Sequence, residues 1–395
     1  MDYITAAEAA EKWGVTPRQA QRLLAAGRIP GAKKYGRAFM IPAGAEKPGD
    51  PRFEFPPTKT LATALEEFIA ATAAPLPKDN PDSVFDLIPE QYTNLRLYVE
   101  CYIAWMRGDY ERSKECYRNI TGDEAIKLRA STTAVAAAVG LGDYPFYQEI
   151  EAYCKGIIKA DMGALATSYA EYALAIVYVS ASVTEMIPSW MKEGDFSVFP
   201  MSMRQDVMCL RMRYLLSLKK YESVLDAVQT ALAFVDSKAG TLPHAGIYLR
   251  VTYAVACCAL GRLDEARDYL RRVMRDCLPI GFISPLMEHS PLFGGLLEQI
   301  LEREFPAYYD SVTGQAKLVI NHWIEFHNLF TKDNIPLILS PRELHITQLA
   351  ARGVPDAEIA GRLHISVGRL KAVKNEIYGK LYVKNRKELS AYIFY

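Results

Sequence analysis

Apolar side chains recur at helical spacing from Leu339 to the C-terminus, which predicts several short helices. The segment 340–343 (Ser-Pro-Arg-Glu) has the form of a capping box that opens the first helix, and Gly353 ends it. A second short helix is expected at about 356–363, and Ser366 is placed to cap a third. The inward-facing positions of this third helix follow helical spacing, and they are Leu370, Val373, Ile377 and Leu381. The pattern therefore predicts a helix-turn-helix.

The opposite face of the third helix is polar and basic, and it carries Arg369, Lys371, Lys374, Asn375 and Tyr378. A basic helix held by two smaller helices has the shape that enters the major groove of DNA. We therefore expect double-stranded DNA as a partner. Base contacts are expected from Arg369 and Asn375, and phosphate contacts from Lys371, Lys374, Lys380 and Lys384.

This segment resembles the LuxR-type DNA-binding domain, a four-helix unit, over about 55 residues, and we place the domain at 337–395. The resemblance rests on three runs, 339–344 (LSPREL), 358–360 (EIA) and 363–368 (LHISVG). Single matches extend it at Lys371, Ile377, Tyr378, Lys380, Leu381, Val383, Asn385 and Arg386.

Several positions depart from the family pattern, so a sequence preference inferred from the family does not carry over. The family usually has Thr where Arg369 stands, Val at Leu370 and His at Val373, and it has Ser-Asn in place of Pro355-Asp356. A domain that keeps this fold but has lost its DNA target is the alternative. The resemblance also implies a homodimer on DNA through the apolar last helix, which carries Leu389, Tyr392, Ile393 and Phe394.

The first 52 residues predict a second helix-turn-helix. Residues 5–8 (Thr-Ala-Ala-Glu) form a capping box for a helix that Gly14 ends, and residues 16–19 (Thr-Pro-Arg-Gln) form another for a helix that Gly27 ends. Two short strands around a basic glycine turn are expected to follow. Base contacts are expected from Arg18, Gln19, Gln21 and Arg22, and phosphate contacts from Lys33, Lys34 and Arg37.

Residues 4–42 are similar to the winged helix-turn-helix of MerR-type and excisionase-type proteins. The shared pattern is T-x-x-E-A-A, a helix that ends in A-G-R followed by I-P, and then G-R with an aromatic-x-I-P strand. The wing would carry Lys33, Lys34 and Arg37. The long coiled coil that commonly follows this domain in MerR-type dimers is missing from the sequence. The alternative is a small protein-docking module.

Between the two ends we expect a linker at 53–82 and a helical-repeat domain at 83–333. Helix pairs are indicated by four similar turns, which lie at residues 108–112, 142–144, 219–223 and 261–266. The spacing and turn chemistry resemble tetratricopeptide repeats, most clearly at 253–270. Stacked helix pairs leave a concave face, so the domain is expected to sense a ligand or to dock a peptide or protein partner. A helical spacer between the two ends is the alternative.

Charge is distributed unevenly although the net charge of the 395 residues is zero. Residues 1–52 hold 9 Lys and Arg against 5 Asp and Glu, and residues 337–395 hold 10 against 5, which leaves 27 against 36 in the middle. Basic ends on an acidic body fit phosphate binding at the ends. The odd count of seven Cys, the absence of a signal peptide and the polar interruptions of the apolar stretch at 164–187 predict a cytoplasmic protein outside the membrane.

Motifs for catalysis are missing, so we do not expect an enzyme, a cofactor or a metal site. The sequence has no phosphate-binding G-x-x-x-x-G-K-[ST] loop and no H-E-x-x-H, and its two S-x-x-K matches lack their companion motifs. A mainly all-α fold is predicted, with a small β-wing near the N-terminus. We interpret the chain as a bacterial transcriptional regulator, and a helical-repeat adaptor whose ends no longer bind DNA is the rival hypothesis.

Overall fold

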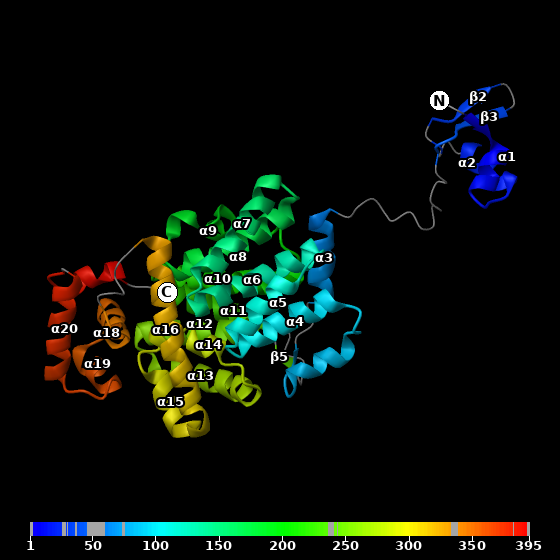
Figure 1. The fold of residues 1–395 in the computed structure, drawn as a ribbon. Helices are drawn as coiled ribbons and strands as arrows, with labels where there is room; N and C mark the ends of the chain where they lie inside the picture. The colour runs from blue at the N-terminus through cyan, green and yellow to red at the C-terminus, as the bar shows by residue number, and fades with distance from the viewer. Residues whose placement is uncertain are drawn as a thin grey trace. The chain divides into compact units, whose positions relative to one another are not determined.

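The chain forms two compact units in the computed structural model, residues 1–59 and residues 60–395, and it is mainly helical as the sequence predicts (Figure 1). The structure describes residues 3–25, 29, 31–35, 38–45, 60–72, 76–235, 241–242, 244–332, 339–381 and 383–392.

The first unit contains a helix-turn-helix and a three-stranded antiparallel sheet. Its elements are β1 (Tyr3–Thr5), α1 (Ala6–Lys12), α2 (Pro17–Ala25), β2 (Lys33–Tyr35) and β3 (Ala38–Pro42), with β3 between β1 and β2. The expected hairpin is present, because Lys33 lies opposite Met40 and Lys34 opposite Phe39. The strand β1 was not predicted, because three residues are too few to show an alternating pattern.

Both predicted capping boxes of this unit are confirmed. At the start of α1 the Thr5 hydroxyl accepts a hydrogen bond from the backbone of Glu8 at 3.3 Å, and the Glu8 carboxylate accepts one from the backbone of Thr5 at 2.7 Å. At the start of α2 the corresponding distances between Thr16 and Gln19 are 3.3 and 3.0 Å. These reciprocal bonds satisfy amide groups that would otherwise lack a partner at a helix start.

The second unit begins with a body of helices, in which short 3₁₀ turns and a two-residue strand pair also occur. In chain order the elements are α3 (Leu61–Ala71), β4 (Leu76–Pro77), η1 (Pro81–Leu87), α4 (Thr93–Met106), α5 (Tyr110–Asn119), α6 (Glu124–Leu141), α7 (Tyr144–Ala160), α8 (Ala164–Ser180), η2 (Thr184–Met186), α9 (Ser189–Glu193), α10 (Met201–Ser217), α11 (Tyr221–Leu232), β5 (Thr241–Leu242), α12 (His244–Leu260), α13 (Leu263–Cys277), η3 (Leu278–Ile280), α14 (Ser284–Met287), η4 (Ser290–Leu292), α15 (Leu296–Glu304), η5 (Pro306–Tyr308) and α16 (Tyr309–Thr331).

Four helix pairs of the body turn at the places where the sequence predicts a turn: α4–α5, α6–α7, α10–α11 and α12–α13. Each turn contains a residue in the left-handed region, with φ of 78° at Gly108, 66° at Gly142, 59° at Lys219 and 76° at Gly261. Glycine adopts this conformation without steric cost, which is why it marks the end of three of these helices.

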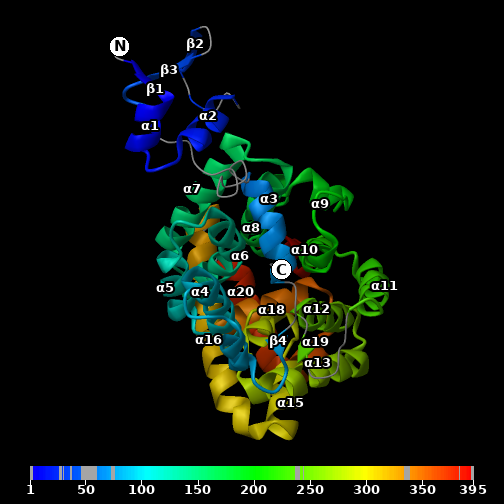
Figure 2. The same cartoon turned by 90° about the vertical axis from the view of Figure 1, so that its right-hand side faces the viewer.

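Helix α3 lies inside the segment that we expected to be a linker. Leu61, Leu65 and Ile69 are buried, and they fall on one face of α3, which packs against α6 and α8 (Figure 2). The proline-rich segments on either side of these residues led to the linker prediction, although the spacing of the three apolar residues is helical. The linker expectation is therefore wrong for residues 61–71.

Helix α16 belongs to two hydrophobic cores. Its residue Phe326 packs in the core of the helical body, whereas Ile324 packs with residues 339–389 in the core of the C-terminal domain. All seven cysteines are buried and free of disulfides. Among the helices that the structure describes, none combines the length and apolar character needed to cross a membrane.

We predict that Leu65→Ala destabilises the body by about 2–5 kcal/mol, because it removes a fully buried side chain and leaves a cavity. The matched control is Glu66→Ala, at an exposed position of the same helix, which should change stability by less than about 0.5 kcal/mol. Urea unfolding of the whole chain measures both. Equal stability of the two variants would show that α3 does not belong to the folded body.

Candidate nucleic-acid interface

The C-terminal domain consists of α18 (Pro341–Ala351), α19 (Asp356–Arg362), α20 (Val367–Leu381) and a final 3₁₀ turn η6 (Arg386–Tyr392). Helices α18 and α19 lie between α20 and α16, so α20 is on the outer side of this domain (Figure 1). The predicted capping box at Ser340 and Glu343 is present. Leu370, Ile377 and Leu381 are buried, and Val373 is half-buried, as their spacing predicts.

The turn between α19 and α20 fixes the start of the expected recognition helix. His364 has a φ of 51°, which places it in the left-handed region and reverses the chain direction within a few residues. The Ser366 hydroxyl then accepts a hydrogen bond from the backbone of Arg369 at 3.1 Å, so Ser366 caps α20 as predicted. This local chemistry holds Arg369 at the exposed first turn of α20.

Three of the predicted contact residues on α20 are exposed: Arg369, Lys371 and Asn375. In the part of the chain that the structure describes, their side chains make no hydrogen bond or ion pair. Lys384, which follows α20, is also exposed. Long basic side chains without an intramolecular partner are available to phosphate oxygens or base edges.

The expectation that Lys374 lies on the open face of α20 is wrong. Lys374 is only 8% exposed, and its Nζ atom lies 2.7 Å from Oδ1 of Asp356 at the start of α19. Lys374 follows Leu370 by four residues, so it lies on the buried stripe of the helix. Tyr378, which we also expected on the open face, is half-buried and packs against the hydrophobic core of the domain.

Lys380 is also engaged within the domain. Its Nζ atom lies 2.7 and 2.8 Å from the two carboxylate oxygens of Glu343, the residue that completes the capping box of α18. Burial would raise the pKa of Glu343, but the hydrogen bonds from Lys380 and Ser340 outweigh it and lower the pKa. Lys380 therefore ties the end of α20 to the start of α18.

Arg386 has a structural role that sequence reasoning missed. Its Nε atom donates to the carbonyl of Ala350 at 2.6 Å, and Nη2 donates to the carbonyl of Val354. These bonds brace the turn at Gly353, whose φ is 88°. The basic residues of the domain thus fall into two groups, one that holds the helices together and one that is exposed.

The N-terminal unit presents a similar set of exposed polar residues. Arg18, Gln19, Gln21 and Arg22 are exposed along α2, although the side-chain oxygen of Gln19 is already used in the capping box with Thr16. Lys33 and Lys34 are exposed on β2, with their Nζ atoms 5.9 Å from the ring centre of Tyr3 and 5.7 Å from that of Phe39. Arg37 lies outside the described residues.

We predict that Asp356→Ala destabilises the C-terminal domain by about 1–3 kcal/mol, because it leaves the buried Lys374 ammonium without its nearest carboxylate. The double variant Asp356→Ala/Lys374→Met should recover most of this loss. Urea unfolding followed by tryptophan fluorescence measures the effect, since Trp323 packs against the core of this domain. A double variant no more stable than Asp356→Ala would contradict the pairing.

Comparison with known proteins agrees with this geometry at the C-terminus. A family model described as "Bacterial regulatory proteins, luxR family" matches residues 337–393. No curated protein and no solved structure matches the chain. The MerR-like and tetratricopeptide-like resemblances stay predictions. Residues 337–393 thus form a LuxR-type helix-turn-helix domain of the kind that binds DNA in bacterial transcriptional regulators.

Proposed function

We propose that this protein is a transcriptional regulator that binds double-stranded DNA with α20 in the major groove. The observation that carries this proposal is the exposed set Arg369, Lys371 and Asn375 on the recognition helix of a LuxR-type domain. Arg369 and Asn375 are suited to read base edges, and Lys371 is suited to bind a phosphate. Lys384 adds a second phosphate contact beyond the helix.

The ion pairs of Lys374, which is buried, and of Lys380, which is partly exposed, restrict this proposal. Each ammonium group already has a carboxylate partner at 2.7 Å. Moving Lys374 to a phosphate would leave Asp356 without its partner, which offsets the gain from the new contact. We therefore assign Lys374 and Lys380 to the positioning of α20 and retain Arg369, Lys371, Asn375 and Lys384 as DNA contacts.

A second DNA contact from the N-terminal unit is part of the proposal. Its support is the exposed face of α2, with Arg18, Gln21 and Arg22, next to the basic strand that carries Lys33 and Lys34. In a winged helix-turn-helix the second helix reads the major groove and the wing contacts the DNA backbone. Here α2 would be the reading helix, and the hairpin with Lys33 and Lys34 would be the wing.

The remaining features of the proposal are the role of the middle domain, the oligomeric state and the compartment. The helical body is a sensor or docking domain between the two DNA-binding units, and the protein acts in the cytoplasm as a homodimer on DNA. Leu389 is completely buried in the C-terminal domain, so it packs inside one copy. Of the other residues expected in the dimer surface, Ile393 and Phe394 lie outside the described residues.

A gel-shift experiment with the whole protein and a pool of genomic fragments, at two salt concentrations, tests the function. Arg369→Ala and Lys371→Ala should each weaken binding, and a lost phosphate contact should reduce the salt slope by about one unit. The control is the double variant Asp356→Ala/Lys374→Met, which removes both members of the buried pair together and should leave the slope unchanged because Lys374 does not contact DNA.

Different failures of this experiment have different meanings. No association of the unchanged protein with duplex DNA in dilute buffer would overturn the regulator proposal in favour of a protein-binding adaptor. Binding that Arg369→Ala and Lys371→Ala leave unchanged would move the DNA contact to the N-terminal unit. Arg22→Ala and Lys34→Ala would then be the variants that weaken binding.

A further inference from the structure

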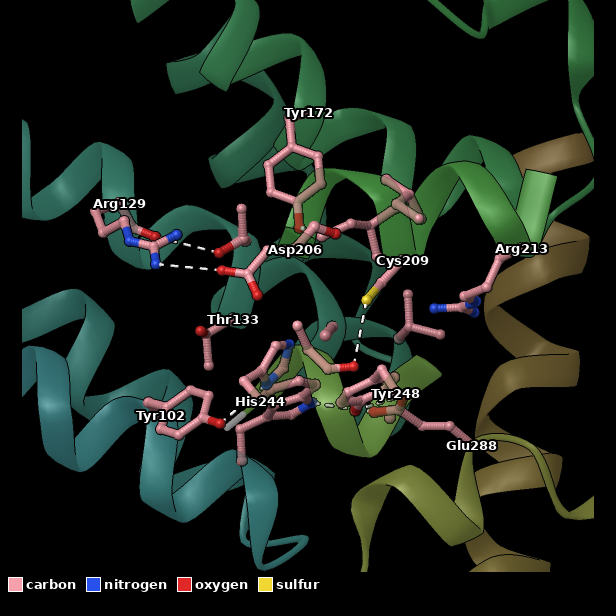
Figure 3. A pocket seen from close by; sticks show the side chains of 18 of the residues that line it. Tyr102, Arg129, Thr133, Tyr172, Asp206, Cys209, Arg213, His244, Tyr248 and Glu288 are labelled. Carbon is pink, nitrogen blue, oxygen red and sulfur yellow. Dashed lines mark hydrogen bonds and ion pairs between the residues drawn. The ribbon is translucent and has the colours of Figure 1, made fainter. Parts of the chain in front are cut away.

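A cavity of about 540 Å³ lies within the second unit (Figure 3). Its walls come from α3, α4, α6, α8, α10, α12, α14 and α16 of the helical body, and also from α18 of the DNA-binding domain. Small-molecule sites in proteins are typically cavities of roughly 300–1,000 Å³, mostly apolar and with a few convergent polar groups. The cavity has this size and this kind of lining.

Arg213, on α10, is a charged group of the cavity that forms no ion pair with the residues that the structure describes, although it is near enough to Glu288 to lower the pKa of that carboxyl. Its guanidinium group points inward (Figure 3), and Nη2 donates a hydrogen bond to the Ser180 hydroxyl at 3.1 Å. No carboxylate of the described residues lies within ion-pair distance of it. A cation facing a partly open, largely apolar cavity is less well solvated than in water, which favours an anion that joins it.

The two carboxylates in the cavity wall are already engaged. Glu288 accepts hydrogen bonds from the Trp105 indole at 3.1 Å and from the Tyr248 hydroxyl at 3.3 Å. Burial raises the pKa of Glu288 to about 7, so part of its negative charge is lost at neutral pH. On the opposite side, Asp206 lies 3.9 Å from Nη2 of Arg129. The cavity lining thus has two arginines against two carboxylates, and only the partial protonation of Glu288 leaves an excess of positive charge beside Arg213 at neutral pH.

Aromatic rings form one wall of the cavity. Trp105 and Tyr248 stack with their ring centres 5.9 Å apart and their planes within 7°, and the His244 ring lies 4.7 Å from that of Tyr248. The Tyr102 hydroxyl is 2.9 Å from Nδ1 of His244, and burial lowers the pKa of His244, which keeps that ring neutral. The three rings pack against one another, so they present an apolar surface to the cavity. They do not surround an open space of the kind that binds a cation.

We propose that this cavity binds a small organic anion, whose acidic group pairs with Arg213 and whose aromatic or aliphatic body lies against the wall of Trp105, His244 and Tyr248. The acidic group is a carboxylate, sulfonate or phosphate, since each accepts two parallel hydrogen bonds from a guanidinium group. This inference specifies the sensor part of the proposed function, and its test requires no DNA.

The cavity connects this ligand to the DNA-binding domain. Leu344 and Gln348, from the first helix of that domain, form part of its lining, next to Ile320 and Trp323 of α16. The same helix is held to the body by Arg352, whose Nη1 donates to the carbonyl of Leu292 at 3.1 Å. A ligand that contacts both the body and α18 binds best when the two are docked, so it stabilises that arrangement.

The contact between the helical body and the C-terminal domain is tightly packed beside the cavity. Gly295, at the start of α15, has a φ of 83°, and a Cβ atom there would lie 2.9 Å from the carbonyl oxygen of Arg362 in α19. Arg362 is itself buried and pairs with Glu358. Burial, together with the nearby Arg352 and Arg362, lowers the pKa of His345 on α18 to about 4, so this residue also stays neutral at physiological pH. Because the contact between α15 and α19 is closely packed, a ligand that shifts α18 would have to displace neighbouring atoms at this contact.

Two fluorescent probes of the same shape test the charge requirement in the full-length protein. Anilinonaphthalene sulfonate carries an aromatic body with one anionic group, and N-phenylnaphthylamine has the same body without the charge. The sulfonate should bind saturably at one site per chain. Arg213→Met should weaken its binding by at least about tenfold, because a charge-assisted pair is lost, and should leave N-phenylnaphthylamine binding unchanged.

Two further variants serve as controls. Arg303→Met removes an exposed arginine outside the cavity lining, and it should bind the sulfonate like the unchanged protein. Arg213→Lys keeps the charge and should retain most of the affinity, which keeps the test valid if Arg213→Met does not fold. The inference is overturned if the sulfonate does not bind, if it binds no better than N-phenylnaphthylamine, or if Arg213→Met binds it as well as Arg303→Met does.

Hydrogen exchange of the full-length protein tests the connection to the DNA-binding domain. The bound sulfonate should slow amide exchange in α18 and leave α1 in the N-terminal unit unchanged. Exchange in α18 that does not respond to a bound probe would overturn the coupling. DNA binding is absent from all of these readouts, so their failure and a failure of the regulator proposal are distinguishable.

Discussion

The cost of removing a charged group from water governs how the basic residues of this protein are used. Lys374 is nearly excluded from solvent, and it has Asp356 as its partner at 2.7 Å. Lys380 has Glu343, and Arg386 has two backbone carbonyls. A buried cation without a partner costs several kcal/mol, so Lys374 is committed to holding the domain together. Lys380 and Arg386 are only partly shielded from water, and they brace the domain through the bonds just named. Arg369 and Lys371 are exposed to water and have no hydrogen-bond or ion-pair partner among the described residues, which is why we propose them as DNA contacts.

The same constraint connects the DNA-binding domain to the cavity. Arg213 faces a mostly apolar space with a serine hydroxyl as its hydrogen-bond partner, whereas the nearby carboxylates are already bonded to other groups. Helix α18 contributes to the core of the C-terminal domain and also to the cavity wall. Helix α16 likewise contributes Phe326 to one core and Ile324 to the other. These shared helices are the structural basis of the coupling that we propose between the cavity and the DNA-binding domain.

Local signals in the sequence predicted much of the fold. Capping boxes and glycine turns are determined by neighbouring residues, so the starts of α1, α2 and α18 and the four turns of the body were predictable. The ion pair of Lys374 was not, because its partner Asp356 belongs to another helix, although the spacing from Leu370 places Lys374 on the buried stripe of α20. The cavity was also beyond prediction, since its lining comes from helices and turns that are far apart in the sequence. Arg213 carries no local signal that separates it from a surface arginine.

Chemical acetylation of lysines, quantified by mass spectrometry with and without duplex DNA, tests the central claim most directly. The division into paired and unpaired basic residues predicts that Lys371 reacts quickly in the free protein and is protected when DNA binds. Lys374, held by Asp356, should react slowly in both states. Equal reactivity of Lys371 and Lys374, or no protection of Lys371 by DNA, would contradict the account.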